Sequence, residues 1–336
     1  MRNVVLILAT AALAGCGGSG GAGGETGPVG GAAGALGGSA GTGQVGGAGA
    51  GSGGIIGIGG IGGATGTGAG AGAGSGGGNG SAEVCDGIDN DGNGIIDDVD
   101  VGADGVCDCL RIATLGIPGT WGLGDVFKNW LNSRSNNGAA DLGSQVLTAE
   151  LLSRYQVIVA QDVSQIGRIY SADEVAALSD WVQRGGGLMT LIGYHDSSER
   201  TNANTLLSPF GIDYAGTSIL QKRGANTVPI TQWRPHPTTS GISAVGMANG
   251  YAVEGTGTTI AIGESTSGST SGTTYIVGAA QTAGKGRVFA WGDEWITYNT
   301  EWQSHPDYQV ELFWLNIIKW LTPVTECQVA IPPNIR

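Results

Sequence analysis

The chain from about residue 110 to residue 321 alternates two hydrophobic patterns. Runs of consecutive apolar residues are typical of strands that are buried on both faces, and apolar residues spaced every three or four positions are typical of amphipathic helices. We expect strands in the segments of the first kind, which are LRIATLGIP (110–118), YQVIVAQD (155–162), GLMTLIG (187–193), TYIVGAAQ (274–281) and GRVFAWGDE (286–294).

Helices are expected in the segments of the second kind, which are DVFKNWLNSRS (125–135), SADEVAALSDWVQ (171–183) and YQVELFWLNIIKWL (308–321). The second of these begins at Ser171, an N-cap with Glu174 three residues later, and ends at Gly185. TNANTLLSPFGIDY (201–214) is expected to hold a short helix that leads to an edge. The many Thr and Ser residues between 256 and 274 are expected at solvated strand edges and turns. Alternation of strands and helices predicts an α/β fold with a doubly wound, mostly parallel sheet and some antiparallel pairing near its end.

The start of the chain has the pattern of an export signal. It reads MRN, then an apolar run from residue 4 to residue 13, then LAGC at 13–16. This resembles the lipobox of bacterial lipoproteins, which implies removal of residues 1–15 and lipidation of Cys16. An ordinary secretory signal with a chance cysteine is the alternative. Gly17, where retention in the inner membrane would call for Asp, implies anchoring in the outer membrane, on its periplasmic or cell-surface side.

Residues 16–81 are mostly Gly with Ala, Ser and Thr, and much of the chain's total of 66 glycines lies here. So few side chains can be buried that we expect a flexible linker, with a reach on the order of 45 Å. The remaining chain is long enough for one α/β domain, which we place at residues 110–323. A small segment at 82–109 precedes this domain, and a tail at 324–336 follows it.

Charge narrows the possible partners. Acidic residues outnumber basic residues by 28 to 15, so nucleic acid and anionic lipid are poor partners. Seven carboxylates and no Lys or Arg lie in EVCDGIDNDGNGIIDDVD, residues 83–100. Such a segment either holds a cation or is a solvated tether.

The spacing within this segment favours calcium. Residues with suitable oxygen atoms stand at positions 1, 3, 5, 7, 9 and 12 of a calcium loop, namely Asp89, Asp91, Asn93, Ile95 (through its carbonyl), Asp97 and Asp100. Gly94 permits the sharp turn at the sixth position, and Ile96 is an apolar anchor at the eighth. We therefore expect calcium as a cofactor. An acidic tether that forms turns without an ion is the alternative.

Asp100 stands where an EF-hand has Glu, and the loop in this respect resembles those of dockerins and thrombospondin type 3 repeats. The whole segment also resembles the Cys-Asp-Gly-Xaa-Asp-Asn-Asp repeats of bacterial surface proteins, which are described as metal-binding and some of which are discussed as copper sites. Gly92 occupies the place of the second Cys of those repeats, which weakens a role in binding a soft metal. Ligation by oxygen alone favours calcium over copper.

Four cysteines remain besides Cys16, and they are Cys85, Cys107, Cys109 and Cys327. An even number in an exported chain predicts two disulfides, for which three pairings exist. Cys107 and Cys109 are too close in sequence to form an unstrained bridge with each other. Of the two remaining pairings, we expect Cys85 with Cys107, which closes the acidic loop, and Cys109 with Cys327, which joins the start of the domain to its end. A zinc site is the alternative, although the spacing is not that of a zinc ribbon.

Two segments of the α/β domain carry a family resemblance. GGGLMTLIGYHDSSERTNANTLLSPFGIDY (185–214) and GKGRVFAWGDEWIT (284–297) resemble the class I glutamine amidotransferase-like fold, in particular its trehalose-utilisation-type and other non-amidotransferase branches. The resemblance covers roughly residues 110–321 and implies a flavodoxin-like sheet. Amidotransferases of this fold use a Cys nucleophile on a strand-to-helix elbow. None of the four cysteines lies on such an elbow, so we expect that activity to be absent. A serine version with Ser197 or Ser198 beside His195 is the alternative.

Polar and aromatic residues follow the strands at their carboxyl ends, where ligands bind in open α/β sheets. The candidate ligand-binding residues are Tyr194, His195, Asp196, Asp293, Glu294, Trp295 and Trp302. Aromatic rings beside carboxylates suit a glycan or an envelope protein, unless the rings only cap the sheet. We expect a non-catalytic binding or structural module at the cell envelope. The alternative is a carbohydrate-active hydrolase that uses His195, Asp293 and Glu294.

The chain has three histidines, His195, His236 and His305, and the last two each precede a proline. If the three imidazoles converged at one crevice with a carboxylate, they would form a transition-metal site. A hydrogen-bonding role for His195 alone, with the other two in exposed turns, is the alternative.

Overall fold

The computed structural model describes residues 81–116, 124–161, 163, 168–193, 197–220, 227–248, 250–266 and 271–335, without the side chains of residues 197 and 217–220. The expected signal peptide, Cys16 and nearly all of the Gly-rich linker therefore lie outside the described residues. No helix in the described ranges has both the length and the apolar character that a membrane crossing requires.

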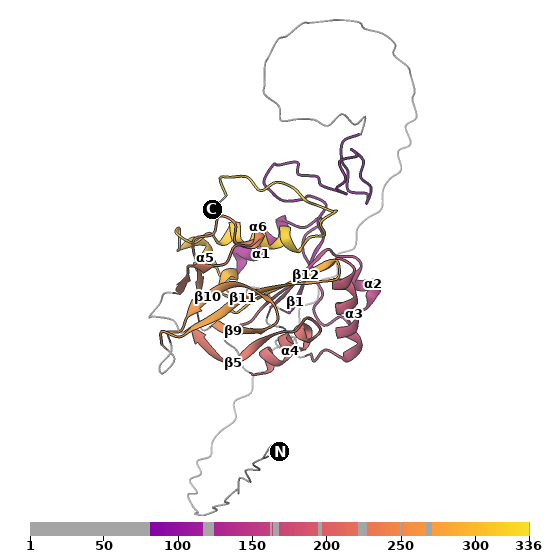
Figure 1. Cartoon of the computed structure of the whole chain (residues 1–336). Coiled ribbons are helices and arrows are strands. Elements are labelled where there is room, and N and C mark those ends of the chain that lie inside the picture. Colours follow the sequence, from indigo (N-terminus) through magenta and orange to yellow (C-terminus); the bar gives the residue numbers. More distant parts are fainter. Residues whose placement is uncertain are drawn as a thin grey trace, which may run out of the picture. The chain divides into compact units, whose positions relative to one another are not determined.

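An eight-stranded sheet is the framework of the described residues, with strand order β2-β1-β3-β4-β12-β11-β10-β7 (Figure 1). The strands are β1 (Ile112–Gly116), β2 (Ala140–Asp141), β3 (Val157–Gln161), β4 (Gly187–Leu191), β7 (Gln232–Trp233), β10 (Thr258–Glu264), β11 (Thr274–Ala283) and β12 (Gly286–Trp291). Neighbouring strands are parallel from β2 to β12 and antiparallel from β12 to β7. The predicted sheet, mostly parallel with antiparallel pairing near its end, is confirmed.

Both faces of the parallel strands are buried. On β3, Val157 and Val159 belong to one apolar cluster, whereas Ile158 and Ala160 belong to another on the opposite face. The first face is covered by α1 (Asp125–Ser133) and α6 (Val310–Leu321), and the second by α2 (Ala149–Leu152), α3 (Ala172–Gln183) and α4 (Ser197–Leu207) (Figure 1). Because neither face is solvated, the strands read as continuous apolar runs, which is why the sequence pattern identified them.

Helix α3 begins as expected. The Ser171 side chain accepts a hydrogen bond from the Glu174 N–H, and the Glu174 carboxylate accepts one from the Ser171 N–H, so the predicted capping box is present. The chain leaves the helix through Gly185, whose φ of 132° lies in the region that favours glycine.

The segment at 201–214, expected to hold a short helix that leads to an edge, changes from helix to strand within its length. Helix α4 ends at Leu207, a 3₁₀ turn follows at Ser208–Phe210, and β5 (Ile212–Leu220) begins two residues later. Pro209 cannot continue an α-helix, and Gly211 takes a left-handed φ of 67° that reverses the chain.

The region between α4 and β11 contains strands that the sequence pattern missed. β5 pairs with β9 (Gly250–Gly255), and β6 (Val228–Ile230) pairs with β8 (Val245–Met247). β10 lies between β11 and β7, with Ile260 and Ala261 fully buried. The first part of the Thr-rich stretch, expected at solvated strand edges and turns, therefore forms an interior strand, although Thr258 at its start is exposed.

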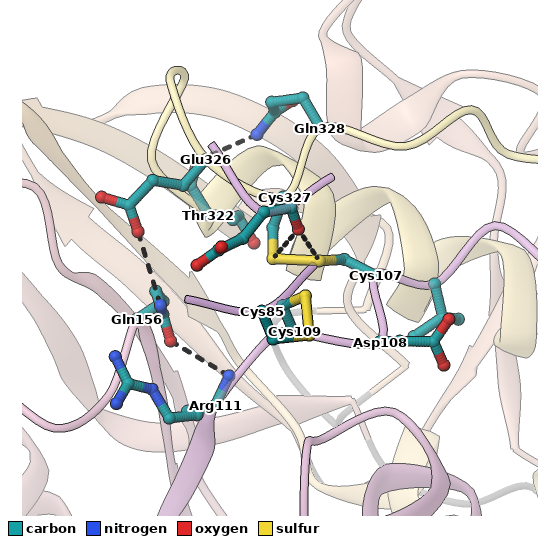
Figure 2. The surroundings of a disulfide bond; sticks show 12 residues. Cys85, Cys107, Asp108, Cys109, Arg111, Gln156, Thr322, Glu326, Cys327 and Gln328 are labelled. Atoms are coloured by element: carbon teal, nitrogen blue, oxygen red, sulfur yellow. Dashed lines mark hydrogen bonds between the residues drawn. A yellow bond between two sulfur atoms is a disulfide. The ribbon is translucent and has the colours of Figure 1, made fainter. Parts of the chain in front are cut away.

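The acidic segment is joined to the C-terminal tail (Figure 2). The disulfides are Cys85–Cys109 and Cys107–Cys327, so the expected pairing was wrong, although the two bridges and their four cysteines were predicted. Residue 327 donates its N–H to the Ile96 carbonyl, and Ile96 forms a parallel bridge with Glu326. This long-range pairing places Cys327 beside Cys107, and spacing along the chain does not encode it.

Candidate functional site

The parallel strands bring several predicted site residues to one edge of the sheet. In their register Gly116 lies opposite Gln161, and Leu191 lies opposite Trp291, so the strands end at a common level. The turn that follows β12 carries Asp293, Glu294 and Trp295 to this carboxyl edge. The other predicted residues here, Tyr194, His195 and Asp196, lie outside the described residues.

Glu294 is buried at this edge, with 2% of its surface exposed. Its Oε2 accepts a hydrogen bond from Gln161 Nε2 at 3.1 Å, and its Oε1 accepts one from the Tyr298 hydroxyl at 2.6 Å. Gln161 Nε2 also lies 3.2 Å from Thr297 Oγ1. The carboxylate therefore links the end of β3 to the 3₁₀ turn Trp295–Thr297. Both carboxylate oxygens of Glu294 therefore accept hydrogen bonds from other side chains of the domain.

Asp293 is equally buried and points toward a different part of the chain. Its Oδ2 accepts the Ala248 N–H at 2.7 Å, and its Oδ1 accepts the Glu294 N–H at 2.8 Å. Burial raises the pKa of the Asp293 carboxyl well above its usual range, and the charges of Glu294 and Glu301 raise it further, against the opposing effect of the two N–H donors. Asp293 thus ties the β8–β9 connection to the end of β12.

The two predicted tryptophans lie in different surroundings. Trp295 is half-buried, and its ring centroid lies 5.0 Å from that of Tyr298. Trp302, on α5 (Asn299–Gln303), packs against Phe127 and Trp130 of α1, with centroid distances of 6.1 and 5.3 Å. Its indole N–H donates to the Ile296 carbonyl. These contacts place Trp302 in the aromatic packing between α1 and α5.

His236 and His305 do not share a site. The His236 ring packs edge-on against Trp320 near the end of α6, whereas His305 stacks on Tyr308, just before α6 begins. Within α6, ten residues separate Val310 from Trp320, about 15 Å at 1.5 Å per residue, and Tyr308 lies before Val310. The convergence of three imidazoles on one ion is therefore excluded. His305 instead lies 3.8 Å from the carboxylate of Glu301.

The acidic segment folds into a tight loop organised by its own carboxylates. The side chain of Asp89 accepts the N–H groups of Gly92, Asn93 and Gly94 at 2.7, 3.1 and 2.8 Å. Asp91 in turn accepts the Asn93 N–H at 2.9 Å. Asp89 and Asp91 thereby point into the loop, at the first and third positions of the predicted calcium site. One carboxylate oxygen each of Glu83, Asp89 and Asp91 lie within 4.8 Å of one another.

The later members of the predicted calcium set have other partners. Asn93 accepts the Ile95 N–H, and Asp97 accepts the N–H groups of Asp86 and Gly87. The carboxylate of Asp100 accepts the N–H groups of two residues in a separate turn, Asp104 and Gly105. The structure therefore brings Asp89 and Asp91 together with Glu83, and not with Asp100.

Two site residues were missed in the sequence. Gln161 is fully buried at the end of β3 and donates a hydrogen bond that orients Glu294. In the sequence, its position at the end of an apolar run was the only sign of this role. Glu83 receives the N–H groups of Asn90, Asp91 and Asp97, which makes it the centre of the acidic loop. It precedes the matched spacing by six residues, so a motif that begins at Asp89 does not include it.

No family model matches the chain, and no curated protein matches it in sequence. Among solved structures, it is similar to a cytoplasmic protein from Salmonella typhimurium, at 15% identity and a TM-score of 0.47, over 63% of this chain and 100% of that one. A ThuA-like protein from Bacteroides uniformis has 12% identity and a TM-score of 0.41, over 63% and 91% of the two chains. A ThuA-like protein from Parabacteroides merdae has 12% identity and a TM-score of 0.41, over 67% and 93%. These similarities concern the fold, and they assign no activity.

Proposed function

We propose that this protein is a lipoprotein anchored in the outer membrane, whose α/β domain is a non-catalytic binding or structural module. The absence of catalysis in this proposal rests on one observation, the burial and hydrogen bonding of the two carboxylates at the carboxyl edge of the sheet. Asp293 and Glu294 are buried, and every carboxylate oxygen of the pair accepts a hydrogen bond from the protein itself. A general acid or base must reach a proton of the substrate, and these two groups are turned into the fold.

The cysteines support the same proposal. The four in the described residues form two disulfides, so none of them carries a thiol that could act as an amidotransferase nucleophile. Two disulfides also suit a protein exported from the cytoplasm. The anchor itself rests on the LAGC sequence, with Cys16 as the acylated residue.

Calcium is the proposed cofactor of the acidic loop. Glu83, Asp89 and Asp91 offer three hard oxygens at distances that one cation bridges, and in the described residues no Lys or Arg pairs with them. Bound calcium would neutralise carboxylates that otherwise repel each other. Its role in this proposal is structural, because the loop adjoins the disulfide Cys107–Cys327, which joins the segment to the C-terminal tail.

The catalytic question is tested by a screen of the purified protein against envelope glycans and their fragments, together with Asp293→Asn and Glu294→Gln. We expect no turnover by any of the three proteins. Turnover by the wild type that either substitution abolishes would instead identify the protein as a carbohydrate-active hydrolase.

The anchor is tested in cells by membrane fractionation and by mass spectrometry of the N-terminal peptide. We expect an acylated N-terminal cysteine in the outer-membrane fraction, and a Cys16→Ser protein that is not acylated. An unmodified wild-type protein in the soluble fraction would show that the LAGC sequence belongs to an ordinary secretory signal.

A further inference from the structure

The opposite, amino-terminal edge of the sheet holds a cavity of about 710 Å³, within the size range of small-molecule sites. We call it the amino-edge cavity. The residues that matter for its chemistry are Arg111, Tyr155, Arg184, Lys285, Val324 and Glu326. None of them belongs to the carboxyl-edge site or to the acidic loop.

The parallel register explains why three cations meet here. Arg111 directly precedes β1, Arg184 follows α3 before β4, and Lys285 lies in the tight turn before β12. β1, β3, β4 and β12 are in register, so the residues that precede them share one edge. Backbone bonds fix the positions, because Lys285 donates its N–H to Gln183 and Arg184 donates its N–H to Asp180 and Trp181.

The charge of the cavity is opposite to that of the protein. The chain has a net charge of −13, yet three cations and one carboxylate, Glu326, line this space. Within the described residues, no ion pair is formed by Arg111, Arg184 or Lys285. Glu326 is turned toward Gln156, whose Nε2 lies 3.4 Å from its Oε2 (Figure 2). Unpaired cations in an acidic protein are available to a ligand.

Capping of α3 does not account for these cations. Cationic side chains near a helix C-terminus often compensate its exposed carbonyls. Here the carbonyls of Trp181, Val182 and Gln183 already accept N–H groups from the following residues and from Lys285. The side chains of Arg184 and Lys285 are thus free to face the cavity.

The C-terminal tail forms one wall of the cavity. Pro323, Val324, Thr325 and Glu326 line it, and Cys327 is bonded to Cys107 immediately afterwards. Val324 is 60% exposed and offers an apolar surface next to the cations. The disulfide, together with the backbone bonds of Ile96 to Thr325 and Cys327, holds this wall in place.

We propose that the amino-edge cavity binds a small organic anion with at least two negatively charged phosphate or carboxylate groups. Two guanidinium groups provide planar, paired donors that match such oxyanions, and Lys285 adds a point charge. The half-buried ring of Tyr155 and the side chain of Val324 would contact the less polar part of the ligand.

Isothermal titration calorimetry with pyrophosphate and with citrate tests this proposal in the intact, oxidised protein. We expect saturable binding of at least one of the two anions with one site per chain, and weaker binding at higher salt. Preference for pyrophosphate would assign phosphate as the recognised group, and preference for citrate would assign carboxylate. Absence of saturable binding of both at millimolar concentration would overturn the proposal.

Variants connect the binding to the cavity. Arg184→Ala with Lys285→Ala should weaken binding at least tenfold, and Arg111→Ala at least threefold. Lys128→Ala, on α1, removes the same charge from a residue that does not line the cavity, and should change affinity less than twofold. Circular dichroism checks that each variant is folded. Equal affinity in the wild type and in a folded double variant would overturn the proposal.

Discussion

The α-carbon of Gly193 lies directly against the carboxyl group of Glu294. A β-carbon added to residue 193 would come within 2.7 Å of the Glu294 carboxyl carbon and of both its oxygens. Because the carboxylate accepts hydrogen bonds from Gln161 and Tyr298, it cannot move away from residue 193 without straining or breaking one of them. The glycine two residues after the end of β4 is thus required by a residue about 100 positions later in the chain.

We predict that Gly193→Ala lowers the free energy of unfolding by about 1–3 kcal/mol, because it overpacks a filled site. Urea denaturation measures the change. Gly216→Ala is the matched control, since among the described residues no atom beyond its chain neighbours lies within 4 Å of its added β-carbon. Equal stability of the two variants would contradict the close packing of Gly193 on Glu294.

The disulfide pattern predicts unequal losses of stability. Cys107–Cys327 spans 220 residues and Cys85–Cys109 spans 24, so the chain-entropy model assigns them about 5 and about 3 kcal/mol. We expect the Cys107→Ser/Cys327→Ser protein to unfold at a lower denaturant concentration than the Cys85→Ser/Cys109→Ser protein. Peptide mapping without reduction should recover the same two pairs. Recovery of Cys109 joined to Cys327 would contradict the structure.

Calcium at about 0.1–1 mM should raise the melting temperature of the mature protein, because an ion that binds only the folded loop stabilises it. Asp91→Ala and Glu83→Gln should abolish this rise, since both carboxylates face the same space as Asp89.

Two substitutions control the calcium experiment. Asp100→Asn should leave the calcium-induced rise in place, because Asp100 accepts hydrogen bonds in a different turn. Asp213→Asn, at an exposed position of β5, should also have no effect on it. Loss of the rise in Asp100→Asn alone would instead favour a loop closed at its twelfth position. If calcium does not raise the melting temperature of the wild-type protein, the proposal that calcium is a cofactor is wrong.

Burial lowers the pKa of His236 below its usual value of 6.5, and the charge of Arg287 lowers it further. The imidazole therefore stays neutral in the folded state at pH values where the unfolded chain takes up a proton. Its contribution to stability is present above pH 6.5 and is lost as the pH falls through 6.5 toward the folded pKa. NMR titration should give a midpoint below 6.5 for His236. A midpoint at or above that value would contradict its burial against Trp320. Arg287→Gln should raise the midpoint.

The sequence alone determined the elements whose pattern is local. Strands β1, β3, β4, β11 and β12 are apolar because helices or other strands cover them, and the capping box at Ser171 and Glu174 involves residues three positions apart. The doubly wound sheet followed from the alternation of these elements. Spacing also singled out Asp89 and Asp91, as calcium ligands or, in the alternative, as turn formers, and each carboxylate accepts hydrogen bonds from backbone groups within five residues.

Only the tertiary structure decided the contacts between distant segments. Cys327 meets Cys107 because the tail pairs with Ile96. Glu294, which follows β12, is turned inward because it bonds to Gln161, 133 positions earlier, at the end of β3, and β4 lies between these two strands. Arg111, Arg184 and Lys285 gather at one edge because parallel strands begin at the same level. Pairing over such separations depends on register and packing across the whole sheet. The spacing of residues along a single segment determines neither the register of the strands nor their packing.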